Sequence, residues 1–460
     1  MERLHLKIHG IVQGVGFRPF IHKLVQAYDL QGYIKNTSSG VELELEGERL
    51  ELERFAADIP AKAPKLALIE ETEAGYSRRL KNFHGFEIRS SQREENCSTL
   101  VSPDICVCDD CLREMRDRRD RRYRYPFINC TNCGPRFTII RGLPYDRAST
   151  SMGSFPMCPD CEREYHDIEN RRYHAQPDCC ESCGPRLFCL DMTGRELPGD
   201  AIETARELLK AGKILAIKGL GGIHLACLGN EPQAVNSLRR RKQRDEKPFA
   251  LMCRDTDCAR KYCRVSPEEE QILTSFHRPI VLLRKKRPGL EYLSENGRLG
   301  VMLPYTPLHY LLMGEDIDML VMTSANLSDR PILYENRQAL EQLRDIADAC
   351  LLHDRDIQTR CDDSLCWVLD GKEYFARRSR GYAPFPLDAG KELESILACG
   401  AEQKASFCLS KGRYVFQSQH IGDLKNLETL ESYQQQIEPV SYTHPPSPRD
   451  VEESRMPSSA

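Results

Sequence analysis

The sequence lacks any apolar run of 18 residues, the length at which a membrane-spanning helix becomes a candidate. Its first ten residues alternate between polar and apolar side chains, as in a short strand, and have no signal-peptide pattern. Nor does one sign of charge prevail: 65 Lys and Arg against 69 Asp and Glu leave a net charge of -4. We therefore expect a cytoplasmic protein that does not contact a membrane.

A nucleic-acid-binding surface is not expected either. The densest basic run, residues 113–124, alternates Arg with Asp and Glu. Such mixed runs are typical of a solvated face rather than of a phosphate-binding stripe. With 460 residues, the chain is long enough for roughly three domains of ~150 residues each.

Cysteine is abundant, with 21 residues, and eight of these form two quartets of identical C-x2-C-x18-C-x2-C spacing. This spacing fits tetrahedral zinc. Redox C-x-x-C motifs are the alternative, but they occur singly rather than as four in two equal frames. We expect the other thirteen cysteines to be reduced and mostly buried. The proposed ligands are Cys108, Cys111, Cys130 and Cys133 for one ion, and Cys158, Cys161, Cys180 and Cys183 for the other.

The two quartets are copies of one unit. Residues 130–136 read CTNCGPR, and residues 180–186 read CESCGPR. The Arg-Tyr pair at residues 122–123 returns at residues 172–173. Four thiolates leave zinc no open coordination position, so the two ions should be structural and the chemistry should lie elsewhere.

Residues 1–91 have the patterning of an independent α+β domain. A strand, a helix, two strands around a Thr-Ser-Ser-Gly turn, a second helix and a last strand or two follow in order. This β-α-β-β-α-β order predicts a ferredoxin-like sandwich.

The first strand-to-helix loop of this domain reads GIVQGVGFR over residues 10–18. Glycines let successive N–H groups converge at a helix N-terminus, and Arg18 adds a guanidinium suited to phosphate. Asn36, at the end of the next strand, could orient a water. The loop with its downstream Asn resembles acylphosphatase, which implies phosphate binding by Val15, Gly16, Phe17 and Arg18 and a nucleophilic water on Asn36.

Residues 198–386 change to an α/β pattern in which loops at strand ends carry polar groups suited to nucleotide phosphates. The sequence Lys-x-Arg-x-x-Lys-Pro begins at Lys242, Thr-Ser-Ala-Asn begins at Thr323, and an Arg-rich segment follows. In this order they resemble the YrdC-like family, in which ATP with Mg²⁺ activates a carbamate-type carbonyl as its adenylate. The nucleotide-binding residues implied are Lys218, Lys242, Arg244, Lys247, Thr323, Ser324, Asn326, Arg378 and Arg380.

An acylphosphatase-like domain, a tandem finger region at residues 104–190 and a YrdC-like domain resemble, in this order, the HypF family of hydrogenase-maturation carbamoyltransferases. The resemblance implies that carbamoyl phosphate is split at the N-terminal site and that ATP converts carbamate to carbamoyl-AMP. It also implies that the carbamoyl group passes to the C-terminal cysteine of HypE, as precursor of the cyanide ligands of nickel-iron hydrogenase.

Residues 393–438 resemble the opening strands of a third, carbamoyl-transferring domain of that family, which normally continues for hundreds of residues. We expect the short strands in this fragment to lack partners, and the final transfer to be lost. Residues 439–460 are Pro- and Ser-rich without periodicity, and we expect a disordered or non-native tail.

Two other functions fit parts of this pattern. A zinc-organised scaffold with inert flanking domains would keep the cysteines but would not need Arg18, Asn36, Lys242 or Thr323. A threonylcarbamoyl-AMP synthase acting in tRNA modification would need a basic RNA surface, which the near-neutral charge does not favour.

Overall fold

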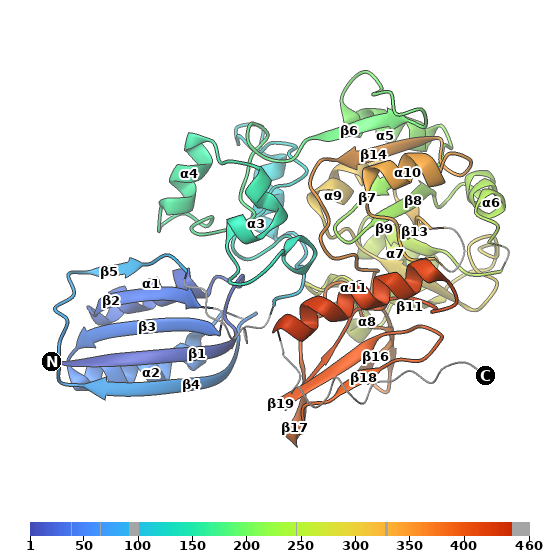
Figure 1. Ribbon diagram of the computed structural model, residues 1–460. Helices are drawn as coiled ribbons and strands as arrows, with labels where there is room; N and C mark the ends of the chain where they lie inside the picture. The colour runs from blue at the N-terminus through green and yellow to red at the C-terminus, as the bar shows by residue number, and fades with distance from the viewer. Residues whose placement is uncertain (38, 65, 92–100, 245, 327–329, 444–460) are drawn as a thin grey trace.

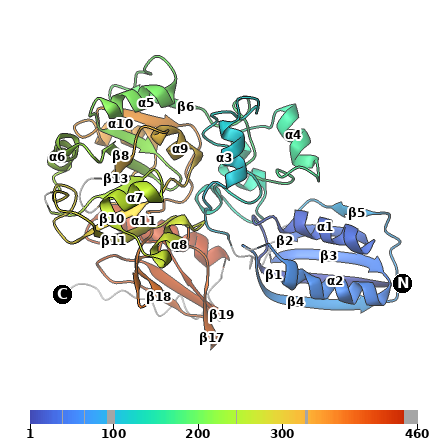
Figure 2. The same cartoon turned by 180° about the vertical axis from the view of Figure 1, so that it is seen from behind.

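The computed structural model describes residues 1–37, 39–64, 66–91, 101–244, 246–326 and 330–443, with side chains as far as residue 437. Figure 1 shows an N-terminal α+β domain, a finger region, a larger α/β domain and a C-terminal segment. In both Figure 1 and Figure 2, the fingers lie between the N-terminal domain and the larger domain. The predicted multidomain mixture of α+β and α/β folds is therefore confirmed.

The N-terminal domain has the predicted β-α-β-β-α-β order. Its five-stranded sheet has the order β4-β1-β3-β2-β5, in which β1 is antiparallel to β3 and β4, while β5 is parallel to β2. The elements are β1 (Glu2–Ile11), α1 (Phe17–Tyr28), β2 (Gln31–Thr37), β3 (Gly40–Gly47), α2 (Arg49–Lys62), β4 (Leu68–Ser77) and β5 (Phe86–Ile88).

Alternation along β1 determines which face of this sheet is buried. Leu4, Leu6 and Ile8 are fully buried and share one hydrophobic core with Phe17 of α1 and Phe55 of α2. Because successive strand residues point to opposite faces, the side chains of the intervening residues point away from this core. The core thus fixes α1, and with it the loop that precedes α1.

The finger region has little regular structure. Each finger begins with a short helix directly after the first cysteine of its quartet: α3 (Asp109–Arg116) follows Cys108, and α4 (Pro159–His166) follows Cys158. Three short 3-10 helices lie between the fingers: η1 (Phe137–Ile139), η2 (Arg147–Ser149) and η3 (Ser151–Ser154). The expected boundary at residue 190 falls inside β6 (Leu187–Asp191), which pairs with a strand of the larger domain.

The larger domain is built on one mixed sheet of eleven strands, in the order β16-β15-β11-β12-β9-β13-β8-β7-β14-β6 with β10 beside β11. Its other strands are β7 (Leu215–Lys218), β8 (Ile223–Leu228), β9 (Ala250–Cys253), β10 (Cys263–Arg264), β11 (Ile280–Lys285), β12 (Arg298–Met302), β13 (Met319–Ser324), β14 (Ala349–His353), β15 (Leu365–Leu369) and β16 (Lys372–Arg377). Its helices are α5 (Ala201–Lys210), α6 (Pro232–Arg241), α7 (Thr256–Tyr262), α8 (Pro267–Thr274), α9 (Pro307–Met313) and α10 (Asn336–Gln342).

The C-terminal segment forms a small sheet and a helix. β19 (Phe407–Gln417) pairs with both β17 (Leu387–Leu393) and β18 (Leu397–Cys399), so the expectation of partnerless strands was wrong. α11 (Leu427–Thr443) continues past residue 438, where the tail was expected to begin, and residues 444–460 lie outside the described part of the chain. Among the described residues, no helix combines the length and apolar character needed to span a bilayer.

Candidate functional sites

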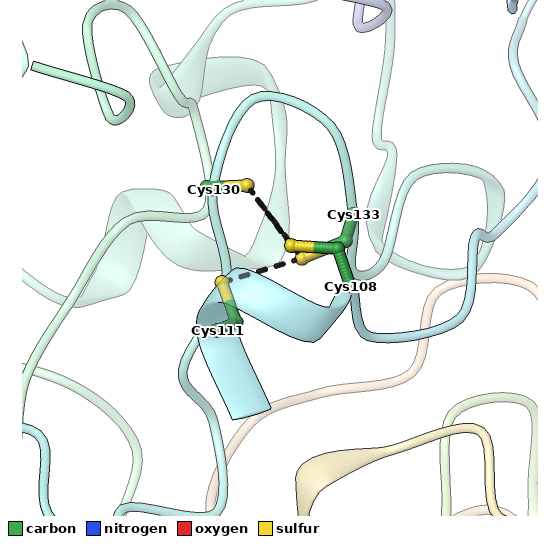
Figure 3. A group of neighbouring side chains, drawn as sticks. All are labelled: Cys108, Cys111, Cys130 and Cys133. Atoms are coloured by element: carbon green, nitrogen blue, oxygen red, sulfur yellow. Dashed lines mark hydrogen bonds between the residues drawn. The ribbon is translucent and has the colours of Figure 1, made fainter. Parts of the chain in front are cut away.

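The two cysteine quartets assemble as the spacing predicts. In the first, neighbouring Sγ atoms are 3.6–3.8 Å apart (Figure 3). In the second, they are 3.5–3.8 Å apart. A tetrahedron with Zn–S bonds of ~2.3 Å has edges of ~3.8 Å, so both quartets fit a zinc ion with all four thiolates as ligands.

Each finger also donates hydrogen bonds to the cysteines of the other. Arg171 Nη2 in the second finger lies 2.8 Å from Cys111 Sγ in the first. Fifty residues earlier, Arg121 Nη2 in the first finger lies 3.1 Å from Cys161 Sγ in the second. The neighbouring arginines form ion pairs across the two fingers in the same way: Arg172 pairs with Glu114, and Arg122 pairs with Glu164. The duplicated units therefore interlock through partly buried charge-assisted contacts, which hold the two quartets as one body.

The glycine-rich loop forms a cradle at the N-terminus of α1. Gly14 and Gly16 adopt φ of 71° and 75°, a left-handed conformation that side chains rarely accept. Gly16, Phe17 and Arg18 line a cavity of about 350 Å³, while the Val15 side chain is buried in the domain core. The Arg18 guanidinium is almost completely buried and lies 3.5 Å from the Asp146 carboxylate.

The opposite wall of this cavity comes from the finger region. Thr131, Tyr145, His174 and Gln176 line it together with the loop. Arg136, from the CGPR repeat of the first finger, donates from Nε to the Gly14 carbonyl over 2.6 Å.

Two side chains of this wall bury polar atoms that have no hydrogen-bond partner among the described residues: Tyr145 Oη and His174 Nδ1. Burial, with the nearby charge of Arg18, lowers the pKa of His174 to about 3, so the ring is neutral at physiological pH. A neutral imidazole and a phenol can each hydrogen-bond to a small polar ligand.

Asn36 lies in β2 beside this cradle. Its side chain is fully buried, and its Oδ1 atom has no hydrogen-bond partner among the described residues. Gln13 connects the two segments, because its Nε2 donates to the Thr37 carbonyl over 2.8 Å and its Oε1 accepts from the Tyr145 amide over 2.9 Å. Asn36 itself is not among the residues that line the cavity.

The larger domain holds a cavity of about 2120 Å³ that is open to solvent. It brings together six of the predicted nucleotide-binding residues from two sequence motifs. Four strands supply part of the floor, through Ala250 of β9, Leu282 of β11, Gly300 of β12 and Thr323 of β13. The six predicted residues are Lys242, Arg244, Lys247, Thr323, Ser324 and Asn326.

Lys242 connects the two motifs. Helix α6 ends at Arg241, so Lys242 is the first residue of the loop that follows the helix. Its Nζ donates to the Ser324 carbonyl over 2.7 Å and to the backbone and side-chain oxygens of Asn326 over 2.8 Å each. Burial, together with the charges of Arg244 and Lys247, lowers the pKa of Lys242 to about 7.

Three predicted residues lie outside this cavity. Lys218 lines a separate cavity of about 440 Å³ between the fingers and the sheet, and donates to Asn336 Oδ1 over 2.9 Å. Arg378 binds backbone carbonyls at residues 382 and 385. Arg380 binds the Asp363 carboxylate over 2.5 Å and the carbonyls at residues 277 and 278. Their donors are thus engaged by the protein itself.

The cavity also contains residues that were not predicted. His224 Nε2 lies 3.0 Å from the Asp363 carboxylate, and His420 Nδ1 lies 3.0 Å from the Asp362 carboxylate. His420 comes from the C-terminal segment, which therefore forms part of the wall. An isolated histidine has no spacing signal in the sequence, although the paired aspartates at residues 362–363 point to this loop.

Four family models match consecutive parts of the chain. They are Acylphosphatase over residues 4–88, HypF finger over residues 107–140 and 157–190, Telomere recombination over residues 207–379, and HypF Kae1-like domain over residues 391–450. The matches agree in order with the parts of the structure, and the last continues past residue 438.

Known relatives and solved structures match this chain along nearly its full length. Carbamoyltransferase HypF2 of Cupriavidus necator is 45% identical over 460 residues, which cover 94% of this chain and 56% of the relative. A crystal structure of full-length HypF in its phosphate- and nucleotide-bound form is 50% identical, with a TM-score of 0.92 over 96% of this chain and 58% of the other. The HypF structure of T. kodakarensis is 44% identical, with a TM-score of 0.89 over 96% and 57%. The chain spans a little over half the length of these relatives.

Proposed function

This chain belongs to the HypF carbamoyltransferase family, and from that premise we propose that it is an ATP-dependent carbamoyltransferase of nickel-iron hydrogenase maturation. Its substrates are carbamoyl phosphate and ATP with Mg²⁺, and the acceptor that we propose for a protein of the relatives' length is the C-terminal cysteine of HypE. The proposal places it in the cytoplasm, where cysteine thiolates remain reduced.

One observation carries the proposal: the finger region contacts both a cradle suited to an acyl phosphate and the sheet that bears the large cavity. Arg136 donates to the Gly14 carbonyl of the cradle over 2.6 Å. On the other side, the Val107 amide donates to the Tyr305 carbonyl of the larger domain over 3.0 Å. A scaffold protein would not require two such sites on one interlocked core.

The first proposed step is hydrolysis of carbamoyl phosphate. Arg18 and the amides at the start of α1 hold the phosphoryl oxygens, where the guanidinium and the helix N-terminus stabilise negative charge. Asn36 orients the attacking water through its buried Oδ1 atom, which has no other hydrogen-bond partner in the described chain. The products are phosphate and carbamate.

The second proposed step joins carbamate to AMP in the large cavity. A carbamate oxygen attacks the α-phosphorus of ATP, the bond to the bridging oxygen breaks, and pyrophosphate leaves. Lys242, Arg244 and Lys247 steady the charge on the phosphates, while Ser324 and Asn326 supply hydroxyl and amide groups. Carbamate decomposes in water, so enclosure by the protein protects it. For a protein with the full length of the relatives, we also propose that the carbamoyl group is transferred to HypE.

Carbamoyl-phosphate-dependent exchange of labelled pyrophosphate into ATP tests both steps. Arg18→Ala should abolish phosphate release and exchange together, because it removes the supply of carbamate, with a loss of order 10²-fold or more. Lys242→Ala should abolish exchange and leave phosphate release unchanged. Exchange that persists in Arg18→Ala, or that is absent from the folded wild type, would contradict the proposal. The mass of HypE after incubation with the chain shows separately whether delivery occurs.

A further inference from the structure

Three arginines lie side by side across three neighbouring strands of the large sheet. Arg264 of β10 is the direct antiparallel partner of Arg284 of β11, and Arg284 is the direct partner of Arg298 of β12. Residues directly opposite each other point to the same face of a sheet, and like charges in such pairs are destabilising. No ion pair of the described residues involves any of the three. We call these residues the arginine row.

The arginine row lies in a cleft without a carboxylate. The cleft has a volume of about 1030 Å³, and Lys285, which follows Arg284 in β11, also borders it, although its ammonium donates to the Ser294 carbonyl. Leu282, Asn296, Gly297 and the arginine row complete its described lining. The Arg298 guanidinium donates to the Leu282 carbonyl over 3.0 Å, which holds it in place. A solvated charged surface usually mixes both signs, and this cleft does not.

This cleft continues the large cavity. Leu282 and Asn296 line both. Along β11, Ile280, Leu282 and Arg284 alternate with residues of the other face, so Arg284 lies on the same sheet face as the cavity floor, ~7 Å along the strand from Leu282. An anion held in the cavity can therefore extend onto the arginine row.

We propose that the arginine row binds a pyrophosphate group. Adjacent strands lie ~5 Å apart, which puts the bases of these side chains side by side, and each planar guanidinium matches two phosphoryl oxygens, so neighbouring arginines can bind linked phosphates. The proposal rests on the function inferred above, in which ATP occupies the large cavity and pyrophosphate leaves it. The group is either the β- and γ-phosphates of bound ATP or the released pyrophosphate.

Calorimetric titration of the zinc-loaded 460-residue chain with inorganic pyrophosphate, ATP and AMP tests the proposal. We expect Arg284→Ala to weaken pyrophosphate binding about tenfold or more and to leave AMP binding unchanged. Arg240→Ala is the control, since Arg240 is exposed on α6 and lines neither cavity. Because the substitution removes repulsion, the variant should melt no lower than the wild type.

The ATP titration distinguishes the two sources. A matching loss of ATP affinity in Arg284→Ala assigns the arginine row to the β- and γ-phosphates, and an unchanged ATP affinity assigns it to the released product. Unchanged pyrophosphate affinity in Arg284→Ala and in the Arg264→Ala/Arg284→Ala double variant would overturn the proposal. The proposal would also be overturned if the protein bound a short RNA through the arginine row but did not bind pyrophosphate through it. Row-dependent pyrophosphate binding in a protein without exchange activity would contradict the adenylation step alone.

Discussion

Arg171 Nη2 donates to Cys111 Sγ over 2.8 Å, so a residue of the second finger supports a thiolate of the first. The same guanidinium also contacts the Glu114 carboxylate, with 2.8 Å between Nε and Oε1. A cationic donor beside a cysteine favours the thiolate, which is the form that binds zinc. The second quartet receives the equivalent contact from Arg121 over 3.1 Å, and each metal site therefore depends on the fold of the other finger.

Arg171→Ala should weaken zinc binding at the first quartet far more than at the second. Loss of a residue that supports metal ligands typically costs about 10–100-fold in affinity. The measurement is the rate of zinc release to a chromogenic chelator, in which one of two equivalents should become fast. Arg113→Ala is the matched control, because the exposed Arg113 side chain pairs with the Asp110 carboxylate and contacts no quartet cysteine among the described residues. Equal release from both sites in Arg171→Ala would show that the contact does not support the metal.

Cys130→Ala should remove one zinc and unfold the first finger, because zinc-binding free energy is folding free energy at such a site. The interlocking arginines predict that the damage spreads: the second zinc should also be released faster. Plasma emission should give two zinc ions per wild-type chain and one or fewer in the variant. Retention of both ions would refute the assignment of Cys130 as a ligand. Cys399→Ala, an exposed cysteine outside the quartets, serves as the control.

The sequence predicted the parts of this molecule better than it predicted their contacts. The zinc quartets and the glycine-rich loop depend on local spacing, so they could be found along the chain. The wall of the cradle could not, because Tyr145 and His174 meet Arg18 from more than 120 residues away and follow no shared period. Lys218 and Arg380 were assigned from motif resemblance alone, and folding engages their donors with protein oxygens.

Strand pairing in the C-terminal segment was also not predicted from the sequence. Its strands were expected to lack partners because the corresponding domain of the family normally continues for hundreds of residues. In the structure the two expected strands pair with each other, as β18 and β19, and β17, which begins at Leu387 before the expected start of the segment, pairs with the other edge of β19. Strand pairing is not encoded in local spacing, so neither the pairing of β18 with β19 nor the addition of β17 could be predicted from the residue pattern.

His174→Asn should broaden the acyl-phosphate specificity of the N-terminal site. His174 closes the cavity opposite Arg18, and a shorter side chain enlarges it. Asn accepts the left-handed conformation of this residue, φ 52°, so the fold should survive. We expect kcat/KM for benzoyl phosphate to rise relative to that for carbamoyl phosphate by about tenfold. His166→Asn, an exposed ring neighbour that does not line the cavity, should change nothing. An unchanged ratio in His174→Asn would place the acyl group elsewhere.

ATP binding at pH 8 should be accompanied by uptake of a proton at Lys242. Burial lowers the pKa of this lysine from its usual 10.5 to about 7, so it is mostly neutral at pH 8 in the free protein. The negative charge of a triphosphate favours the ammonium form and raises the pKa again. ATP affinity should therefore fall as pH rises above 7, because protonation of Lys242 must accompany binding.

Calorimetry in buffers of different ionisation enthalpy measures this proton directly. The buffer-dependent part of the binding heat should correspond to net proton uptake at pH 8 and fall towards zero at pH 6, where Lys242 is already charged. Lys242→Met should remove the uptake. Lys218→Met should retain it, although burial lowers the pKa of Lys218 to about 8, because Lys218 lies outside the cavity. Uptake that disappears in Lys218→Met and persists in Lys242→Met would move the phosphate-binding lysine to the smaller cavity beside the fingers.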